Sequence, residues 1–525
     1  MDHQLLYILL ALYLGVTVFL GYLGFRHTKS AKDYMIAGGN VHPVLMALAY
    51  GATFISTSAI VGFGGVAGVY GMSLLWLTAC NIVVGIFVAF VFYGIKTRQI
   101  AHALQVKTFP EFLGARFDSP FIRKFSAAVI SLTMPLYAAA VMIGGARYME
   151  EALNISYTSA VTVFALIVFV YVFFGGLRGV IYTDAMQAII MFSGMVILVI
   201  LTYSMLGGVT AAHAKLEAIK HLVPASLAAK GHQGWTAMPA FGSELWWFVI
   251  STLILGVGIG VLAQPQLAVR FMTVGSSKDI YKGLSVGSLF ILCIPGVAYT
   301  VGALSNVYFF EHTGNIALAA TAAGGSAPNV DKIIPLFITQ AMPEWLKYLF
   351  LFTLFSAGMS TLSGQFHIIS TSISYDLNPK GGRSDKRTLL LARLGTLFGF
   401  VITTLLAFQL PLGVIAVATA LFFGMCTSAF LPMYTAALYW PKITPQGAIW
   451  SMVTASVVYL LVVLFVHERE AAIFGVCSKI FGVSTLAVAP WTYIDPLVIT
   501  LPVSSLVLVV ASLLTQPVQQ AAVVK

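Results

Sequence analysis

Long apolar stretches are the feature of this sequence that most limits its fold. We count thirteen of about 18 to 28 residues, each able to cross about 30 Å of hydrocarbon as an α-helix. Strands of a membrane β-barrel would be about ten residues long and would alternate in polarity, so helices are predicted. The chain is expected to be an all-α polytopic membrane protein. The predicted spans are 5–25, 43–70, 72–95, 124–147, 157–175, 184–207, 245–268, 283–307, 346–375, 388–409, 412–436, 446–466 and 488–513.

The basic residues predict how these helices are oriented. Because successive spans alternate in direction, the loops fall on two sides, and most of the 28 Lys and Arg residues follow odd-numbered spans. Loops rich in Lys and Arg face the cytoplasm, so the N-terminus is predicted outside and the C-terminus inside a cell membrane. Contact of these loops with anionic lipid headgroups accounts for the net charge of +10, and no nucleic-acid partner is expected.

Other classes of protein are disfavoured by what the sequence contains. No nucleophile, base and orienting group converge, so an enzyme is not expected. The four cysteines follow no metal-binding or disulfide pattern, and no cofactor is predicted. The P-loop motif of an energised pump does not occur. A channel or a transporter-like sensor remains as an alternative from a different class.

Two predicted spans are interrupted by small or hydroxyl-bearing residues. Residues 51–58 (GATFISTS) lie inside the second span, and residues 256–260 (GVGIG), followed by Pro265, lie inside the seventh. Such residues also permit close helix packing, which is the alternative interpretation of either segment. The two spans are five apart, as in transporters with two inverted repeats of five helices and broken helices at the transport site. Both helices are therefore predicted to be broken.

A third segment offers ligands for a cation. On a helix, Ala357, Ser360 and Thr361 share one face and can present a carbonyl and two hydroxyl oxygens to one point. An unwound second span can add the carbonyl oxygens of Ala52 and Ile55. Five neutral oxygens suit a small hard cation that binds reversibly, and the lack of a carboxylate favours sodium over a proton. Alternatively, both hydroxyls bond to their own helix.

Several separated motifs make the chain resemble the sodium:solute symporter family. The most specific is residues 175–187 (GGLRGVIYTDAMQ), which is similar to the family's signature at a cytoplasmic helix start. Residues 264–272 and 357–365 resemble further family motifs, and residues 335–345 resemble its extracellular gate helix. The resemblance implies a LeuT-like core in a single domain, 1–525. It implies a leading helix in 1–42, repeats in 43–207 and 245–436, and C-terminal helices in 437–525.

The resemblance also assigns roles to residues. The family's core sodium site falls on the same five positions that the helical spacing selects. Asp184 matches an acidic residue associated with sodium release toward the cytoplasm. The alternative is that Asp184 begins a helix or pairs with Arg178.

The substrate pocket is expected between the two broken helices. Phe54 stands where the family's proline carriers have an acid and its sugar carriers an amide. A phenyl ring can neither neutralise an ammonium group nor form a hydrogen bond with a sugar hydroxyl. Residues 52–56 are instead similar to the branch that carries iodide, monocarboxylates and anionic vitamins. The seventh span likewise lacks the aromatic residues of proline carriers. The residues expected to line the pocket are Thr53, Phe54, Ser56, Thr57, Val257 and Val261.

Arg147 ends the fourth span and is the candidate for binding a substrate carboxylate through its planar guanidinium. The alternative is that it reaches the membrane surface or pairs with Glu150 or Glu151.

Together these features predict a symporter that uses sodium to import a small organic solute by alternating access. A monocarboxylate-like anion is the first choice, and an amino acid such as proline, or pantothenate, is the alternative. The expected partners are the solute, the sodium ion and the lipid bilayer, with no prediction of oligomeric state.

Overall fold

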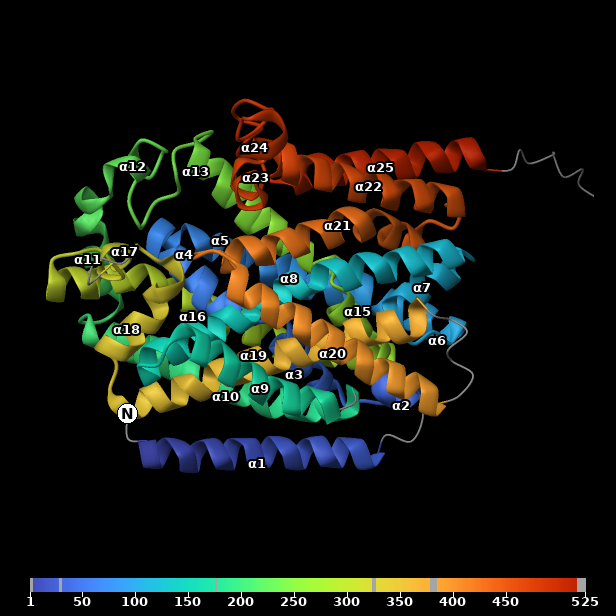
Figure 1. Ribbon diagram of the computed structural model, residues 1–525, viewed down its shortest axis with the longest axis horizontal. Coiled ribbons are helices and arrows are strands. Elements are labelled where there is room, and N and C mark those ends of the chain that lie inside the picture. Colours follow the sequence, from blue (N-terminus) through green and yellow to red (C-terminus); the bar gives the residue numbers. More distant parts are fainter. Residues whose placement is uncertain (1–2, 28–30, 175–176, 323–326, 378–384, 517–525) are drawn as a thin grey trace, which may run out of the picture.

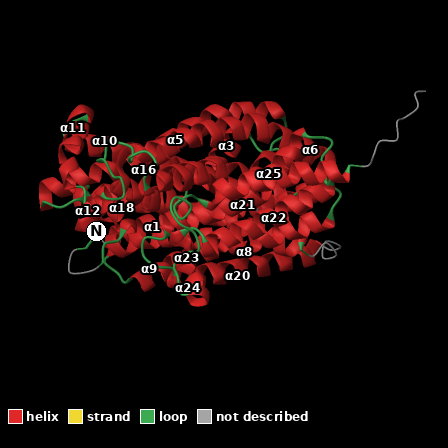
Figure 2. Cartoon of the chain, turned by 90° about the horizontal axis from the view of Figure 1, so that it is seen from above, coloured by secondary structure: helices red, strands yellow, loops and turns green. Residues whose placement is uncertain are grey.

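The computed structural model describes residues 3–27, 31–174, 177–322, 327–377 and 385–516. Within these ranges the chain is helical, and the one β-type contact is an isolated bridge between Val41 and Val274. The long helices lie side by side along the long axis of the molecule (Figure 1), and the view from above shows helices joined by short loops (Figure 2). The prediction of an all-α fold is confirmed.

Many of the described spans are single continuous helices that begin and end near the two ends of the molecule. They are α1 (His3–His27), α8 (Pro120–Leu153), α9 (Tyr157–Phe174), α10 (Leu177–Met205), α16 (Ser277–Thr313), α19 (Glu344–Thr371), α20 (Asp385–Gln409), α21 (Ile415–Tyr439), α22 (Pro445–Phe465) and α25 (Pro496–Thr515).

Three predicted spans are composite. The second consists of α3 (Pro43–Phe54), η2 (Ser58–Gly62) and α4 (Phe63–Tyr70). The third consists of η3 (Gly71–Leu74), α5 (Leu75–Cys80), η4 (Asn81–Gly94) and α6 (Ile95–Leu104). The seventh consists of α13 (Glu244–Trp247), η6 (Phe248–Val257), α14 (Gly258–Gly260), η7 (Val261–Ala263) and α15 (Pro265–Met272).

Eleven described helices are long and apolar enough to cross a membrane, and two shorter apolar helices, Pro43–Phe54 and Tyr157–Phe169, accompany them. One of the eleven, Ser58–Leu104, contains the end of the second predicted span and the whole third span. Gly71 separates the two with φ +74°, and a Cβ there would lie 2.0 Å from the Trp235 carbonyl oxygen, so only glycine fits. The predicted spans therefore fall on helices, although α25 begins later than expected.

Short helices gather at the two ends of the molecule. The end that holds the start of α1 also carries α11 (Val209–Ala218), α12 (Ala225–Ala228), α17 (Ala317–Ala320) and α18 (Ile333–Ala341), as Figure 1 shows. It is called the predicted outer face below. The opposite end, called the predicted cytoplasmic face, carries α2 (Ala31–Ile36) and α7 (Phe109–Arg116). The remaining short helices are η1 (Ala37–Gly39), η5 (Ile219–Leu222), η9 (Val330–Lys332), η10 (Ser372–Asp376), α23 (Glu468–Phe474) and α24 (Val476–Phe481).

Helix α3 lies in the centre, where it packs against α10, α16 and α19. Glycines allow this close approach: a Cβ on Gly51 would lie 2.6 Å from Phe290, and one on Gly364 would lie 3.0 Å from Thr53. Residues of α3 from Tyr50 to Phe54 are buried. The fold thus places the end of α3 deep inside the bundle, against the middle of α19.

Candidate functional site

The second span is broken at the predicted place. Helix α3 ends at Phe54, and Ile55 is extended with φ −91° and ψ 109°. The chain resumes its helical course at Ser58, and the backbone N–H groups of Ala59 and Ile60 donate to the Ser56 carbonyl oxygen. A helix that stops leaves its last carbonyl oxygens without partners from its own backbone, so other groups can use them.

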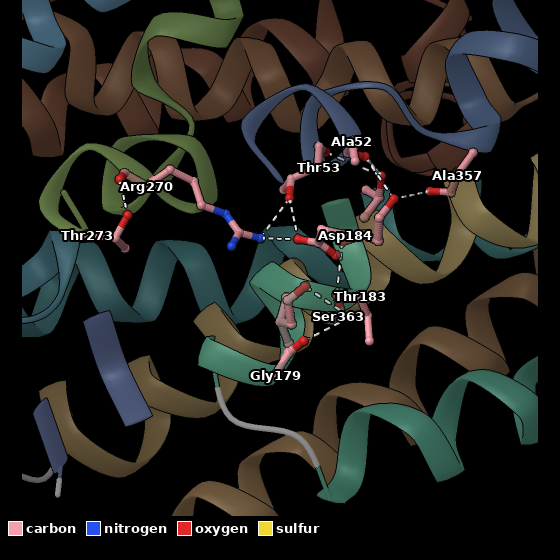
Figure 3. A network of polar contacts seen from close by, with 12 residues as sticks. Ala52, Thr53, Gly179, Thr183, Asp184, Arg270, Thr273, Ala357 and Ser363 are labelled. Atoms are coloured by element: carbon pink, nitrogen blue, oxygen red, sulfur yellow. Dashed lines mark hydrogen bonds and ion pairs between the residues drawn. The ribbon is translucent and has the colours of Figure 1, made fainter. Parts of the chain in front are cut away.

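Two hydroxyls of α19 occupy this helix end. Ser360 Oγ lies 2.9 Å from the Ala52 carbonyl oxygen and 3.2 Å from that of Ala357. Thr361 Oγ1 lies 3.4 Å from the Ala52 carbonyl oxygen and 3.3 Å from that of Thr53. Both side chains are fully buried, and Figure 3 shows Ala52 of α3 facing Ala357 of α19 across this group of contacts.

Four of the five residues expected to hold sodium therefore lie together. Among the described residues, neither hydroxyl bonds to the fifth, Ile55; the carbonyl oxygen of Thr53 takes that place beside Thr361. The bond from Ser360 to Ala357 is of the kind that the alternative interpretation expected, but the same hydroxyl also reaches across to α3.

The spacing of these oxygens suits a hard cation. A cation bound to oxygens at about 2.3–2.6 Å separates neighbouring ligands by roughly 3.3–3.7 Å in an octahedral arrangement. The oxygen pairs here are 2.9–3.4 Å apart, so a movement of a few tenths of an ångström would open the space. All of these donors are neutral, which favours a monovalent ion that must leave again.

A buried ion pair lies beside this group of oxygens. Asp184 Oδ2 on α10 is 2.7 Å from Arg270 Nη2 on α15, and the same nitrogen donates to Thr53 Oγ1 at 2.8 Å. The side chains of Asp184 and Arg270 are 0 % and 1 % exposed. Figure 3 shows that α3, α10 and α15 meet at this point. Thr53, expected to contact the substrate, instead accepts this bond one residue from Ala52.

The alternative that Asp184 begins a helix is wrong, since α10 starts at Leu177. The partner of Asp184 is Arg270, which lies in the core because Pro265 starts a new helix, α15. Gly175 and Gly176 of the family-like motif, and the side chain of Arg178, lie outside the described part of the chain.

The seventh span is broken at a different place from the one predicted. The glycines 256, 258 and 260 stay in helical backbone, and the extended residue is Gln264 with ψ 116°. Proline disfavours helical backbone at the residue before it, so Pro265 produces the break. Two of the glycines serve packing: a Cβ on Gly258 would lie 2.5 Å from Cys80, and one on Gly260 would lie 2.8 Å from Phe423.

The residues expected to line the substrate pocket fall into two groups. Phe54 and Val261 converge on Gly85 of η4, where an added Cβ would be 3.1 and 3.2 Å away from them. Val257, one turn before Val261, is also buried.

Ser56 and Thr57 face α8 instead. Ser56 Oγ accepts from Tyr137 Oη at 3.4 Å, and Thr57 Oγ1 donates to the Val141 carbonyl oxygen. Ser56 and Thr57 thus contact α8, whereas Phe54 and Val261 lie against Gly85 of η4.

Arg147 belongs to a cluster of charges farther along α8, six residues after Val141. Its Nη1 lies 2.8 Å from Glu150, and its guanidinium stacks 3.9 Å from the centre of the Tyr157 ring. Glu150 also pairs with Lys332 of η9 at 3.1 Å. The pair with Glu150 is the alternative that the sequence left open.

Sequence reasoning missed two charged side chains of this region. Arg270 could have been recognised, because it follows a proline inside an apolar span by five residues. A charged side chain at such a position needs a buried acceptor. Asp331 of η9 could not have been recognised in this way. It is 2 % exposed, burial raises its pKa to about 7, and Arg147 and the backbone N–H groups at the start of α21 oppose that rise.

Comparisons with known proteins agree with this arrangement. A model of the sodium:solute symporter family matches residues 34–455. The sodium/pantothenate symporter of Haemophilus influenzae is 27% identical over 468 residues, which cover 86% of this chain and 90% of that protein. The sodium/proline symporter of Escherichia coli is 25% identical over 456 residues, which cover 86% of each chain.

A solved structure shares the fold. A Na+-coupled sialic acid symporter in a substrate-bound outward-open state has a TM-score of 0.75 with this chain at 18% identity, and the match covers 97% of this chain and 96% of that one.

Proposed function

The chain belongs to the sodium:solute symporter family, and we propose that it uses a sodium gradient to import a small solute that bears a carboxylate. Membership confirms that the protein is a transporter rather than an enzyme, and the expected LeuT-like fold is confirmed as well. The family also supports sodium as the coupling ion. The observation that carries the proposal is the contact of Ser360 and Thr361 with the carbonyl oxygen of Ala52 at the end of a broken helix.

Sodium couples to the solute through this helix end. A sodium ion among the oxygens of Ala52, Thr53, Ala357, Ser360 and Thr361 would hold α3 against α19 in place of the present hydrogen bonds. The same segment continues into Phe54, Ser56 and Thr57, which face the proposed solute pocket. Ordering of the break by one ligand therefore favours binding of the other, and the gain in affinity is equal in both directions.

Asp184 and Arg270 are proposed to govern release of sodium. Their ion pair joins α10 to α15 and lies beside Thr53, next to the proposed sodium ligands. Within the described part of the chain, Asp184 Oδ1 and Arg270 Nη1 have no hydrogen-bond partner, so this carboxylate oxygen can meet a departing cation. Separation of the pair would free α15 from α10 and open a route toward the predicted cytoplasmic face.

The solute is proposed to be a monocarboxylate-like anion. Phe54 and Val261 supply an apolar wall, and the hydroxyls of Ser56 and Thr57, which are bonded to α8 in this structure, would supply polar contacts on turning away from it. A proline-like amino acid or pantothenate is the alternative, supported by the names of the two relatives. All of these solutes share a carboxylate. Arg147 remains a candidate partner for it, but only if its bond to Glu150 opens.

Uptake into proteoliposomes tests the function. The purified protein should accumulate a radiolabelled monocarboxylate such as lactate when sodium is added outside, and potassium in its place should support little uptake. Labelled proline and pantothenate are measured alongside and decide between the substrate classes. Uptake that does not saturate with solute, or that is equal in potassium, would contradict a sodium symporter and favour a channel.

A further inference from the structure

A cavity lies away from the two broken helix ends, at the predicted outer part of the molecule. Its volume is about 400 Å³, and it lies where the start of η6 meets α23 and the segment just before α25. Figure 1 shows α13 beside α23 in this region. The lining residues that matter here are Lys230, Phe248, Arg469, Thr492 and Tyr493. Binding pockets for small molecules usually measure about 300–1,000 Å³, so the cavity can hold a small solute.

One cationic side chain that lines the cavity, Arg469, has hydrogen-bond donors that no described residue uses. Lys230 is committed to Glu244 at 2.7 Å, and the buried His467 is paired with Glu470. The Arg469 guanidinium lies 3.4 Å from the centre of the Phe248 ring, and it forms no ion pair or hydrogen bond within the described residues. Stacking uses the face of a guanidinium and leaves its in-plane N–H donors free for a planar acceptor.

We propose that this cavity binds a small carboxylate, held by the in-plane donors of Arg469. Carboxylate and phosphate both match the guanidinium fork with two parallel hydrogen bonds, and the negative charge of Glu468 in the lining disfavours the dianionic phosphate. Thr492 and Tyr493 line the same cavity and carry hydroxyls that can donate to it. Glu468 also lines the cavity, so a single carboxylate fits, with or without an ammonium group, better than a dianion.

The cavity is separate from the proposed transport site. Phe248 is the first residue of η6, and Val257 at its other end is nine residues along, or about 13 Å at the rise of an α-helix. None of the oxygens proposed for sodium lines the cavity. Binding there should therefore not require sodium.

A ligand in the cavity would act on transport through the seventh span. It would tie Phe248, at the start of that broken span, to Arg469 and Thr492, which lie beyond the predicted second repeat. If the seventh span moves during transport, occupancy of the cavity changes the affinity of the transport site, and the change is reciprocal. The site is thus a place for regulation by the transported solute or by another carboxylate.

Equilibrium binding to the full-length protein in sodium-free buffer tests the proposal. The probes are labelled lactate, a simple monocarboxylate, and labelled proline, a zwitterion. At least one of them should bind with one site per chain, and which one binds identifies the ligand class. Arg469→Gln should weaken this binding about tenfold or more, which corresponds to about 1.4 kcal/mol. The affinity of Arg469→Lys should lie between those of the parent protein and of Arg469→Gln, because lysine keeps the positive charge but lacks the planar guanidinium fork.

Three comparisons keep the outcome unambiguous. Lys479→Gln removes an exposed charge on the neighbouring α24 and should leave binding unchanged. Tyr493→Phe, which removes one hydroxyl without emptying the cavity, should weaken binding less than Arg469→Gln. Ser360→Ala should leave the sodium-free binding intact, so failure of sodium-driven uptake would count against the symporter proposal and not against this cavity. The proposal is overturned if neither probe binds without sodium, or if Arg469→Gln binds as tightly as the parent protein.

Discussion

The buried ion pair of Asp184 and Arg270 is where the stability of the protein depends most on single side chains. Both charges are buried, and one further polar atom on each has no hydrogen-bond partner among the residues that the structure describes. The attraction within a buried pair roughly offsets the cost of removing two charges from water. Loss of one partner is far more costly than loss of both, because it leaves a lone charge inside the bundle.

We expect this asymmetry in a double-mutant cycle. Asp184→Asn and Arg270→Gln should each destabilise the purified protein by about 3–5 kcal/mol, seen as a lower midpoint of thermal unfolding. The double variant should recover much of that loss. The exposed pair of Lys215 and Glu311, 2.9 Å apart, is the control and should show a coupling of less than about 1 kcal/mol. Additive losses at Asp184 and Arg270 would disprove the coupling.

How far residues could be predicted from sequence depended on how local their geometry is. The shared face of Ala357, Ser360 and Thr361 follows from helical spacing, so their convergence was predictable. The contact between Asp184 and Arg270 could not be predicted, because the two residues are 86 positions apart and no local pattern specifies how their helices pack. The bond from Thr361 to the Thr53 carbonyl oxygen depends on where α3 ends to within one or two residues, and such boundaries are the least predictable feature of a helix.

At the scale of elements, the two broken spans illustrate different kinds of sequence signal. In the second span the hydroxyl-rich run and the break coincide at Ile55. In the seventh span the glycine run was the wrong signal and Pro265 the right one. Glycine permits a break but does not require it, whereas proline restricts the residue before it and gives up a backbone N–H. Gly258 and Gly260 are needed for close approach to Cys80 and Phe423 instead.

The breaks also explain why the site is central. Both broken spans contain an extended residue, Ile55 in one and Gln264 in the other, with a helix on either side. The Val41 N–H donates to the Thr273 carbonyl oxygen at 2.9 Å, so the start of α3 is tied to the end of α15. The two broken spans are thus joined at the predicted cytoplasmic face, where the proposed release route opens.

At the scale of the whole molecule, the orientation in the membrane rests on the distribution of basic residues. The start of α1 and the end of α25 lie at opposite ends (Figure 1), as an odd number of crossings requires. The rule for basic loops predicts that the N-terminus lies outside and the C-terminus in the cytoplasm. The repeat boundaries at 43–207 and 245–436 also remain predictions made from the sequence.

Thiol labelling in intact cells checks this orientation. Phe241, which is 88 % exposed near the predicted outer face, and Gln105, exposed at the opposite face, are each replaced by cysteine. A membrane-impermeant maleimide should label Phe241→Cys in intact cells and Gln105→Cys only after permeabilisation. The parent protein, whose Cys426 and Cys477 are buried and whose Cys80 and Cys293 are half-buried, gives the background. The reverse pattern of labelling would invert the proposed topology.

The sodium dependence of uptake tests the central claim most directly, namely that Ser360, Thr361 and the end of α3 hold the coupling ion. Ser360→Ala and Thr361→Ala should each raise the sodium concentration for half-maximal uptake by about tenfold, the equivalent of one lost ligand interaction of about 1.4 kcal/mol. Thr371→Val is the matched control, because that hydroxyl lies on the same helix and, among the described residues, bonds only to the backbone of that helix. Half-maximal sodium concentrations that are the same in all three variants and the parent protein would contradict the account.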